Sequence, residues 1–372
     1  MAFMNKKIAL AMAALAACGT AAATEDYDLR YAPGYGAADM SAPFEGGWVF
    51  QAHAYAYSGN IRTTTVGTPT DVSAAIGAPA GSLFATPTIH SNTQINVNGL
   101  LPRLSYMSST TFLGATLGGT VLIPLLHKGS SVSLTGLDGA LSGPALPLLS
   151  GAQQAAILGG FAQAAHTAAK AVTDGNSARS FGVGDMEFSP ILRWSTENTQ
   201  TLFVLTTVAP TGDYDQTRAA NPSAGKFWTF RPAVQYSYIG DGWDFGGRAA
   251  YSFNSRNNET HYHTGNYLNL DATMMKSVSD SMRLGVSAYA VAQTTRDSVS
   301  QQPDLTTFEG QAMEARQAVT EGQKGHVFGA GPEFAYIHGA GDFLIDGRFM
   351  KEFSAKDRPE GFTAIVTLSK PF

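Results

Sequence analysis

Hydrophobic and polar residues alternate along the segment WTFRPAVQYSYIGDGWDFGGRAAYSFN at residues 228–254. In an extended chain Trp228 and Phe230 point to one side, whereas Arg231 points to the other. A period of two residues predicts a strand with one apolar and one polar face. The Gly-Asp-Gly at 240–242 separates two such runs, so the segment is predicted to form an antiparallel hairpin.

The length of these strands and the position of their aromatic residues indicate a membrane protein. Each run covers about twelve residues, whereas strands of soluble sheets usually have five or six. Long alternating strands with aromatic residues at both ends of the apolar face are typical of transmembrane β-barrels, which close so that every backbone group is paired. The predicted aromatic girdle consists of Trp194, Trp228, Phe230, Tyr236, Tyr238, Trp243, Tyr251 and Phe253.

The same alternation predicts twelve strands, an even number as in single-chain bacterial barrels. They are expected at 46–57, 94–106, 111–126, 182–195, 200–211, 226–239, 243–254, 262–276, 281–293, 325–338, 341–353 and 361–372. Connections after the odd strands are longer, at 58–93, 127–181, 212–225, 255–261, 294–324 and 354–360. Long extracellular loops and short periplasmic turns would place both termini in the periplasm. We therefore predict an all-β fold, a transmembrane antiparallel up-and-down β-barrel of about twelve strands, over residues 46–372.

Two further segments are not part of the predicted strands. Residues 24–45 are rich in Gly, Pro and Tyr, and either form a periplasmic lead-in or enter the lumen as a plug. Residues 149–172, in the long extracellular loop 127–181, are rich in Ala with little β-branching, which predicts a helix. This helix either packs on the loops or covers the pore as a lid.

The N-terminus has the pattern of a signal peptide over residues 1–23. Lys6 and Lys7 precede an apolar stretch at 8–17, and the small residues before Thr24 favour cleavage after Ala23. The alternative is a lipobox that would make Cys18 a lipid anchor. Cys18 is the only cysteine, so no disulfide framework and no cysteine metal site are expected.

Charge and hydropathy exclude two other classes of protein. The net charge is −5 over 372 residues and the arginines are scattered, so no nucleic-acid partner is expected. After the N-terminus, no run reaches the ~18 apolar residues that a membrane helix needs. The sequence also suggests no cofactor, and it carries no signal for an oligomeric state.

Several motifs resemble those of a known family. They are YAPGYG (31–36), GVGDMEFSPILRW (182–194), APTGDYD (209–215), GKFWTFRPAVQYSY (225–238), GRAAYSFNSRNNETHYHTGNYLNLD (247–271), GAGPEFAY (329–336) and DRPEGFT (357–363). The chain resembles outer-membrane proteins of the meta-pathway phenol-degradation or SphA-like family, associated with transport of hydrophobic or aromatic compounds. The resemblance implies a bacterial outer-membrane barrel, in contact with lipid, for passive uptake of small hydrophobic or aromatic solutes.

Charged residues of the strands fall almost entirely on the predicted inward face. These pore-lining candidates are Arg103, Asp185, Glu187, Arg193, Arg231, Asp244, Arg248, Asp271, Arg283, Glu333, Asp346, Arg348 and Glu352. They either pair with one another and hold the wall together, or form charged rings that sort solutes. Both signs occur in similar number, which argues against a channel dedicated to anions or to cations.

Other functions have weaker support in the sequence. His261 and His263 lack a third ligand at suitable spacing, so they are expected to form a polar rim and no metal site is predicted. A hydrolase would need a nucleophile and base held by a third group, and no GxSxG motif occurs. We expect no enzyme; the alternatives are a structural or adhesive barrel without transport, or an outer-membrane hydrolase.

Overall fold

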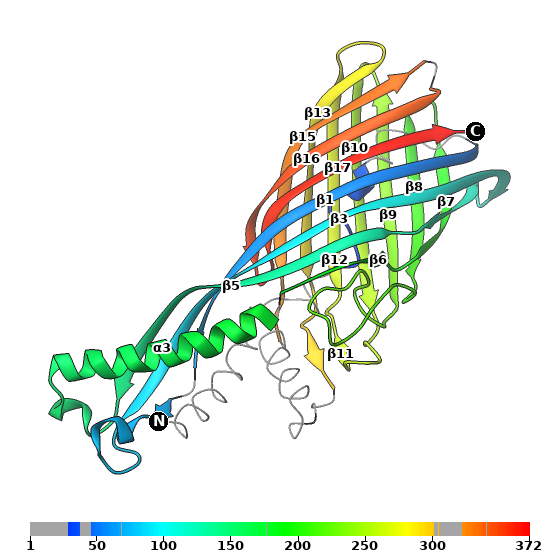
Figure 1. Ribbon diagram of the computed structural model, residues 1–372. Coiled ribbons are helices and arrows are strands. Elements are labelled where there is room, and N and C mark those ends of the chain that lie inside the picture. Colours follow the sequence, from blue (N-terminus) through cyan, green and yellow to red (C-terminus); the bar gives the residue numbers. More distant parts are fainter. Residues whose placement is uncertain are drawn as a thin grey trace.

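Twelve strands form a closed antiparallel ring in the computed structural model, which confirms the predicted barrel (Figure 1). The structure describes residues 29–37, 46–67, 69–175, 177–300, 304, 322–339 and 341–372. In ring order the strands are β1 (Gly47–Val66), β3 (Phe84–Phe112), β4 (Ala115–Leu122), β7 (Glu187–Ser195), β8 (Thr199–Val208), β9 (Thr229–Gly240), β10 (Trp243–Asn254), β12 (Tyr267–Ser277), β13 (Met282–Gln293), β15 (His326–His338), β16 (Phe343–Lys356) and β17 (Glu360–Pro371). Because β1 pairs with both β17 and β3, the ring has no free edge.

The hairpin of β9 and β10 has the predicted register and the predicted two faces. Gln235 faces Arg248 across the pair, and both side chains are buried inside the barrel. The turn at Asp241 and Gly242 has positive φ angles of 55° and 72°, as a two-residue hairpin turn requires. Val234, on the opposite face, is 52% exposed, and on a membrane barrel that face contacts lipid.

β1, β3 and β5 (Leu125–Ser142) continue past the barrel and form an arm (Figure 1). β3 has 29 residues, which corresponds to about 95 Å of extended chain, whereas the bilayer core is about 30 Å thick. β1 pairs with β3 as far as Val66, and β5 pairs with β3 down to Phe84. The predictions of loops over 58–93 and 127–181 were therefore wrong over much of their length. The apolar residues of these segments, such as Ile89 and Leu134, are interrupted by Thr, Ser and Gly, so the alternation of hydrophobicity that predicts a strand is weak there.

The predicted helix is present as α3 (Gly151–Gly175) and lies along the arm rather than over the barrel (Figure 1). Phe161 and Ala165 on its inner face are buried against Ile89 of β3, together with Leu83 and Val72. The helix therefore closes a small apolar core of the arm, and the lid interpretation is wrong. Among the described residues, no helix is both long enough and apolar enough to cross a membrane.

Two neighbouring strands of the wall are interrupted at the same level. β4 ends at Leu122 and β5 begins at Leu125, whereas β6 (Ala178–Val183) and β7 are separated by residues 184–186. The predicted strand 182–195 is thus divided in two, and the predicted strand 111–126 instead covers the end of β3, all of β4 and the start of β5. Pro124 has no N–H to donate, and its carbonyl accepts a hydrogen bond of 2.8 Å from the Gly184 N–H. We call this interruption the wall break.

One further strand begins later than predicted. The expected strand 262–276 starts at Tyr267, and Tyr262–His263 instead form β11, which pairs with β14 (Ser298–Val299) outside the ring. His261 has a φ angle of 55°, so the chain turns there and cannot continue straight into the wall.

Candidate functional site

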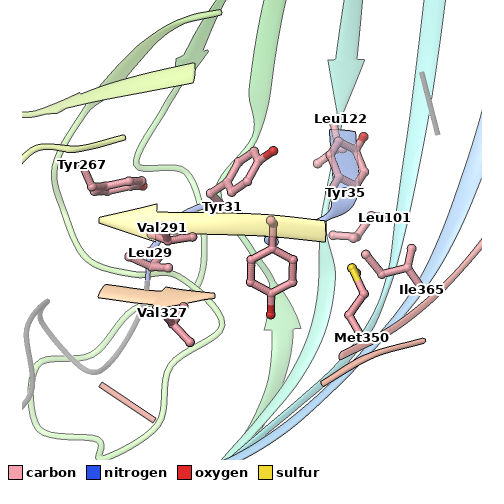
Figure 2. Close-up of a cluster of buried hydrophobic side chains, with 11 residues drawn as sticks. Leu29, Tyr31, Tyr35, Leu101, Leu122, Tyr267, Val291, Val327, Met350 and Ile365 are labelled. Carbon is pink, nitrogen blue, oxygen red and sulfur yellow. The ribbon is translucent and has the colours of Figure 1, made fainter. Parts of the chain in front are cut away.

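The N-terminal segment lies inside the barrel. Residues 29–37, including the short helix η2 (Tyr35–Ala37), form what we call the plug. Tyr31 and Tyr35 of the plug are buried among apolar side chains of the wall such as Leu101, Val291 and Met350 (Figure 2). Of the two interpretations of the lead-in segment, the described residues follow the one in which it enters the lumen.

Polar contacts hold the middle of the plug against β12 and β16. The Tyr31 hydroxyl donates a hydrogen bond to the Asp271 carboxylate, and the Gly34 N–H donates a second one of 2.9 Å to the same group. The Arg348 guanidinium donates to the Gly34 carbonyl at 2.9 Å. Gly34 has a φ angle of 80°, and an added Cβ would lie 2.3 Å from the Met350 side chain, so only glycine fits this position.

The start of the plug is held on the opposite side of the lumen. The Arg30 guanidinium lies 2.9 Å from the Asp185 carboxylate and donates hydrogen bonds to the carbonyls of Gly225 and Phe227. The Arg231 side chain donates in turn to the Arg30 carbonyl. Arg30 therefore contacts one part of the wall, whereas Tyr31 and Gly34 of the motif YAPGYG contact another.

The predicted inward charges are brought together mainly as ion pairs. Arg231 lies 3.3 Å from Glu187, Arg283 lies 2.7 Å from Asp244, and Arg348 contacts both Glu333, at 3.1 Å, and Asp346. Arg103 donates a 2.8 Å hydrogen bond to Gln51, and Glu352 accepts hydrogen bonds of 2.9 Å from Tyr57 and Tyr289. Arg193 is half-buried on β7. Because opposite charges that are close together cancel, these residues do not form rings of one sign.

Four contributors to this network were missed by the sequence analysis. Arg30 and Tyr31 lie in the lead-in segment, for which no contact was predicted, and Tyr57 and Tyr289 have hydroxyl groups that reach Glu352. Tyr57 lies at the end of the first predicted strand, where an aromatic residue is also compatible with the girdle. Tyr57 and Glu352 are 295 residues apart, so no local sequence pattern indicates their hydrogen bond.

A cavity of about 160 Å³ lies between the plug and the wall. One side of its lining is apolar and comes from β1, β3, β4 and β5, with Tyr55, Ile95, Leu101, Leu122 and Leu126. The other side includes Arg231 and Arg248. An apolar cavity of about 150 Å³ is large enough for benzene, so this space can hold one aromatic ring.

The predicted girdle residues lie on the outer surface of the barrel. Trp228, Phe230, Tyr236 and Phe253 are 43–50% exposed, and Trp194 and Trp243 are 37% exposed. Tyr238 and Tyr251 are half-buried, and Tyr251 packs edge-on against Phe253 with ring centres 4.7 Å apart. Large exposed aromatic side chains on a barrel wall are suited to the interface between lipid and water.

The His261 and His263 pair lies at the edge of the loops. His263 Nε2 is 3.0 Å from the Asn254 carbonyl. Within the part of the chain that the structure describes, no three His, Cys, Asp or Glu side chains are placed to hold a metal ion. The Cys18 lipid anchor and the signal peptide lie outside the described residues.

Comparison with known proteins identifies the family. Residues 84–368 match the protein family described as "Putative MetA-pathway of phenol degradation". The chain belongs to this family. Since the match covers the barrel strands from β3 to β17, the resemblance noted in the sequence is confirmed. Among proteins of curated function, none matches in sequence.

Solved structures show the same fold at low sequence identity. The COG4313 outer membrane channel from Pseudomonas putida F1 is 13% identical, with a TM-score of 0.54 over 88% of this chain and 97% of that one. The Pseudomonas putida toluene transporter TodX is 10% identical, with a TM-score of 0.34 over 95% of this chain and 96% of that one. The first similarity shows that the fold is that of an outer-membrane β-barrel.

Proposed function

We propose that this protein is an outer-membrane barrel through which small hydrophobic or aromatic compounds enter passively. The observation that carries the proposal is the 160 Å³ cavity between plug and wall, with an apolar side formed by Leu101, Leu122 and their neighbours. A lumen filled only by paired charges would offer nothing to an aromatic ring. The family and the described fold agree with transport, and the named solutes of similar channels include toluene.

The orientation that fits this role places both termini in the periplasm and the arm outside the cell. β1 begins at Gly47, which pairs with Met107 near the end of β3. The same end of the wall carries the two-residue turn between β9 and β10. The opposite end bears the arm, α3 and the segment 209–228. Outer-membrane barrels keep their short turns in the periplasm and their long connections outside.

The plug divides the route of the solute into two stages. Entry into the cavity requires only that the ring reach the apolar side chains beside Tyr35. Exit requires either that the plug moves, since it occupies the lumen, or that the solute passes sideways where the wall break borders the cavity. Pro124 and Asp185 of the wall break both line the cavity, so a solute in the cavity is already next to this sideways exit.

Solute uptake into liposomes tests the proposal. Vesicles containing the full-length protein should take up phenol or toluene faster than protein-free vesicles, and glucose uptake should stay at the protein-free rate. Glucose is the polar control, because it is a small neutral solute that has no apolar ring to bury. A purified, correctly folded protein that admits no aromatic solute would contradict the proposal.

A further inference from the structure

The cavity has two sides of different chemistry on opposite walls of the barrel. In the ring order of twelve strands, β10 lies six positions from β1 in either direction. Tyr55 on β1 and Leu101 on β3 belong to the apolar side, whereas Arg248 on β10 faces them across the lumen. A solute held between these walls would have to be apolar at one end and polar at the other.

Positive charge predominates in the lining of the cavity. Its ionisable acidic and basic side chains other than tyrosine are Arg30, Lys128, Arg231, Arg248 and Arg358 against Asp185, Glu187 and Glu352. Among the described residues of the lining, that is five cations and three anions. Each of the three carboxylates lies within 4.0 Å of an arginine, in the pairs Arg30–Asp185, Arg231–Glu187 and Arg358–Glu352.

Arg248 is the arginine of this lining outside those pairs. It is 8% exposed, and its Nε atom has no hydrogen-bond partner among the described residues. Asp271 faces it across the strand pair, but the Asp271 oxygens accept hydrogen bonds from Tyr31 and Gly34 of the plug. Among the described residues, no carboxylate lies within ion-pair distance of Arg248. A buried guanidinium in this situation is strongly stabilised by an anion that can accept two parallel hydrogen bonds.

We infer that the cavity binds single-ring aromatic carboxylates, with the ring against the apolar side and the carboxylate on Arg248. This inference rests on the proposed function and specifies its substrate class. An aromatic carboxylic acid is ionised at neutral pH, as Asp and Glu side chains are, whereas phenol, like the tyrosine side chain with its pKa of about 10, stays neutral. The planar carboxylate matches the guanidinium fork, and one ring fills the 160 Å³ cavity.

The test compares benzoate with benzyl alcohol, a neutral solute of nearly the same shape. Both are measured in liposome uptake with the full-length protein and with the variants R248Q and R248K. The control variant is R193Q, because Arg193 also points inward but lies outside the cavity lining. Binding of benzoate to the protein in detergent is measured by calorimetry in parallel, so that the site is detected even if the plug prevents passage of the solute.

The expected result is that R248Q lowers benzoate affinity and uptake by about tenfold or more, since it removes a charge-assisted pair of hydrogen bonds. R248K should retain part of the uptake because it keeps the charge without the fork. Benzyl alcohol uptake should be unchanged in all variants, and R193Q should behave as wild type. If benzyl alcohol enters but benzoate binding is the same in wild type and R248Q, the inference is wrong and the proposed function stands. If neither solute enters the wild type, the proposed function fails, and calorimetry alone then decides whether the carboxylate site exists.

Discussion

The Tyr31 hydroxyl of the plug donates a hydrogen bond to the Asp271 carboxylate of β12, across 240 residues of sequence. The same carboxylate also accepts a hydrogen bond from the Gly34 N–H, and Arg348 on β16, three strands further round the ring, donates to the Gly34 carbonyl. A single buried carboxylate thus fixes both the side chain and the backbone of the plug. We therefore expect the position of the plug in the lumen to depend on Asp271.

Replacing Asp271 with Asn should make the plug open more often. The variant loses a charged acceptor that holds two plug groups, and such a hydrogen bond contributes about 1.5–3 kcal/mol, equivalent to roughly a tenfold or larger rise in the open population. Single-channel recording in planar bilayers would show more frequent openings. D244N is the matched control, because Asp244 is also an inward carboxylate but pairs with Arg283 rather than with the plug. Equal opening frequencies in D271N and D244N would show that Asp271 is not the latch.

Filling the cavity should block the solute without preventing folding. Val97 lines the cavity and is half-buried, so V97F adds a ring where the solute would lie. Uptake of phenol into liposomes should fall severalfold, while overpacking should cost no more than about 1–3 kcal/mol of stability. V234F adds the same ring on the lipid-facing side of β9 and should leave uptake unchanged. Undiminished uptake in V97F would mean that the route avoids this cavity.

A charge on the outer face of the barrel should be costly only within the lipid zone. V286R introduces an arginine at a 52% exposed position of β13 and should reduce the free energy of unfolding by up to about 2–4 kcal/mol. V66R, at a 66% exposed position at the end of β1 in the arm, should change it little. Urea unfolding in lipid vesicles, followed by heat-modifiable gel migration, measures both. A similar loss in the two variants would argue that the arm is also immersed in lipid.

The arm and the barrel should respond separately to a change in the core of the arm. Phe161 of α3 is 5% exposed, and F161A should cost about 3–5 kcal/mol locally. Hydrogen exchange should rise in α3 and in the outer half of β5, while the barrel strands keep their protection. L148A removes a side chain that is 83% exposed and serves as the control. Faster exchange throughout β9 and β10 would show that the arm and the barrel unfold together.

The sequence predicted those strands that have lipid on one face and the lumen on the other, because their residues alternate between apolar and polar. The β9 and β10 register follows from a period of two residues and one turn, because lipid on one side and the lumen on the other impose opposite chemistry on alternating positions. In the arm, the inner positions of β3 include Ser91 and Thr93 as well as Ile89 and Ile95, so their contrast with the polar outer positions is weak and the strand was predicted only from residue 94 onward. The wall break depends on Pro124 meeting Gly184 on the neighbouring strand, which neither segment reveals alone.

Of the candidate site, the sequence predicted the residues of the barrel wall but not those of the plug. The parity of the strands placed Asp271, Arg348 and Glu333 on the inner side, where the structure has them. The plug partners of Asp271 and Arg348 could not be predicted, because Tyr31 and Gly34 reach them from a segment without periodicity. Similarly, the sequence does not distinguish Arg248 from Arg231. Only the structure shows that Glu187 on β7 forms an ion pair with Arg231 and not with Arg248.

The central claim is that an aromatic ring passes through the cavity between plug and wall. The most direct measurement is phenol uptake into liposomes by wild type, D271N and V97F, reconstituted at equal density and checked for folding by heat-modifiable migration. We expect faster uptake by D271N than by wild type, and slower uptake by V97F than by either. Phenol uptake that is equal in all three proteins, or equal to that of protein-free vesicles, would contradict this claim.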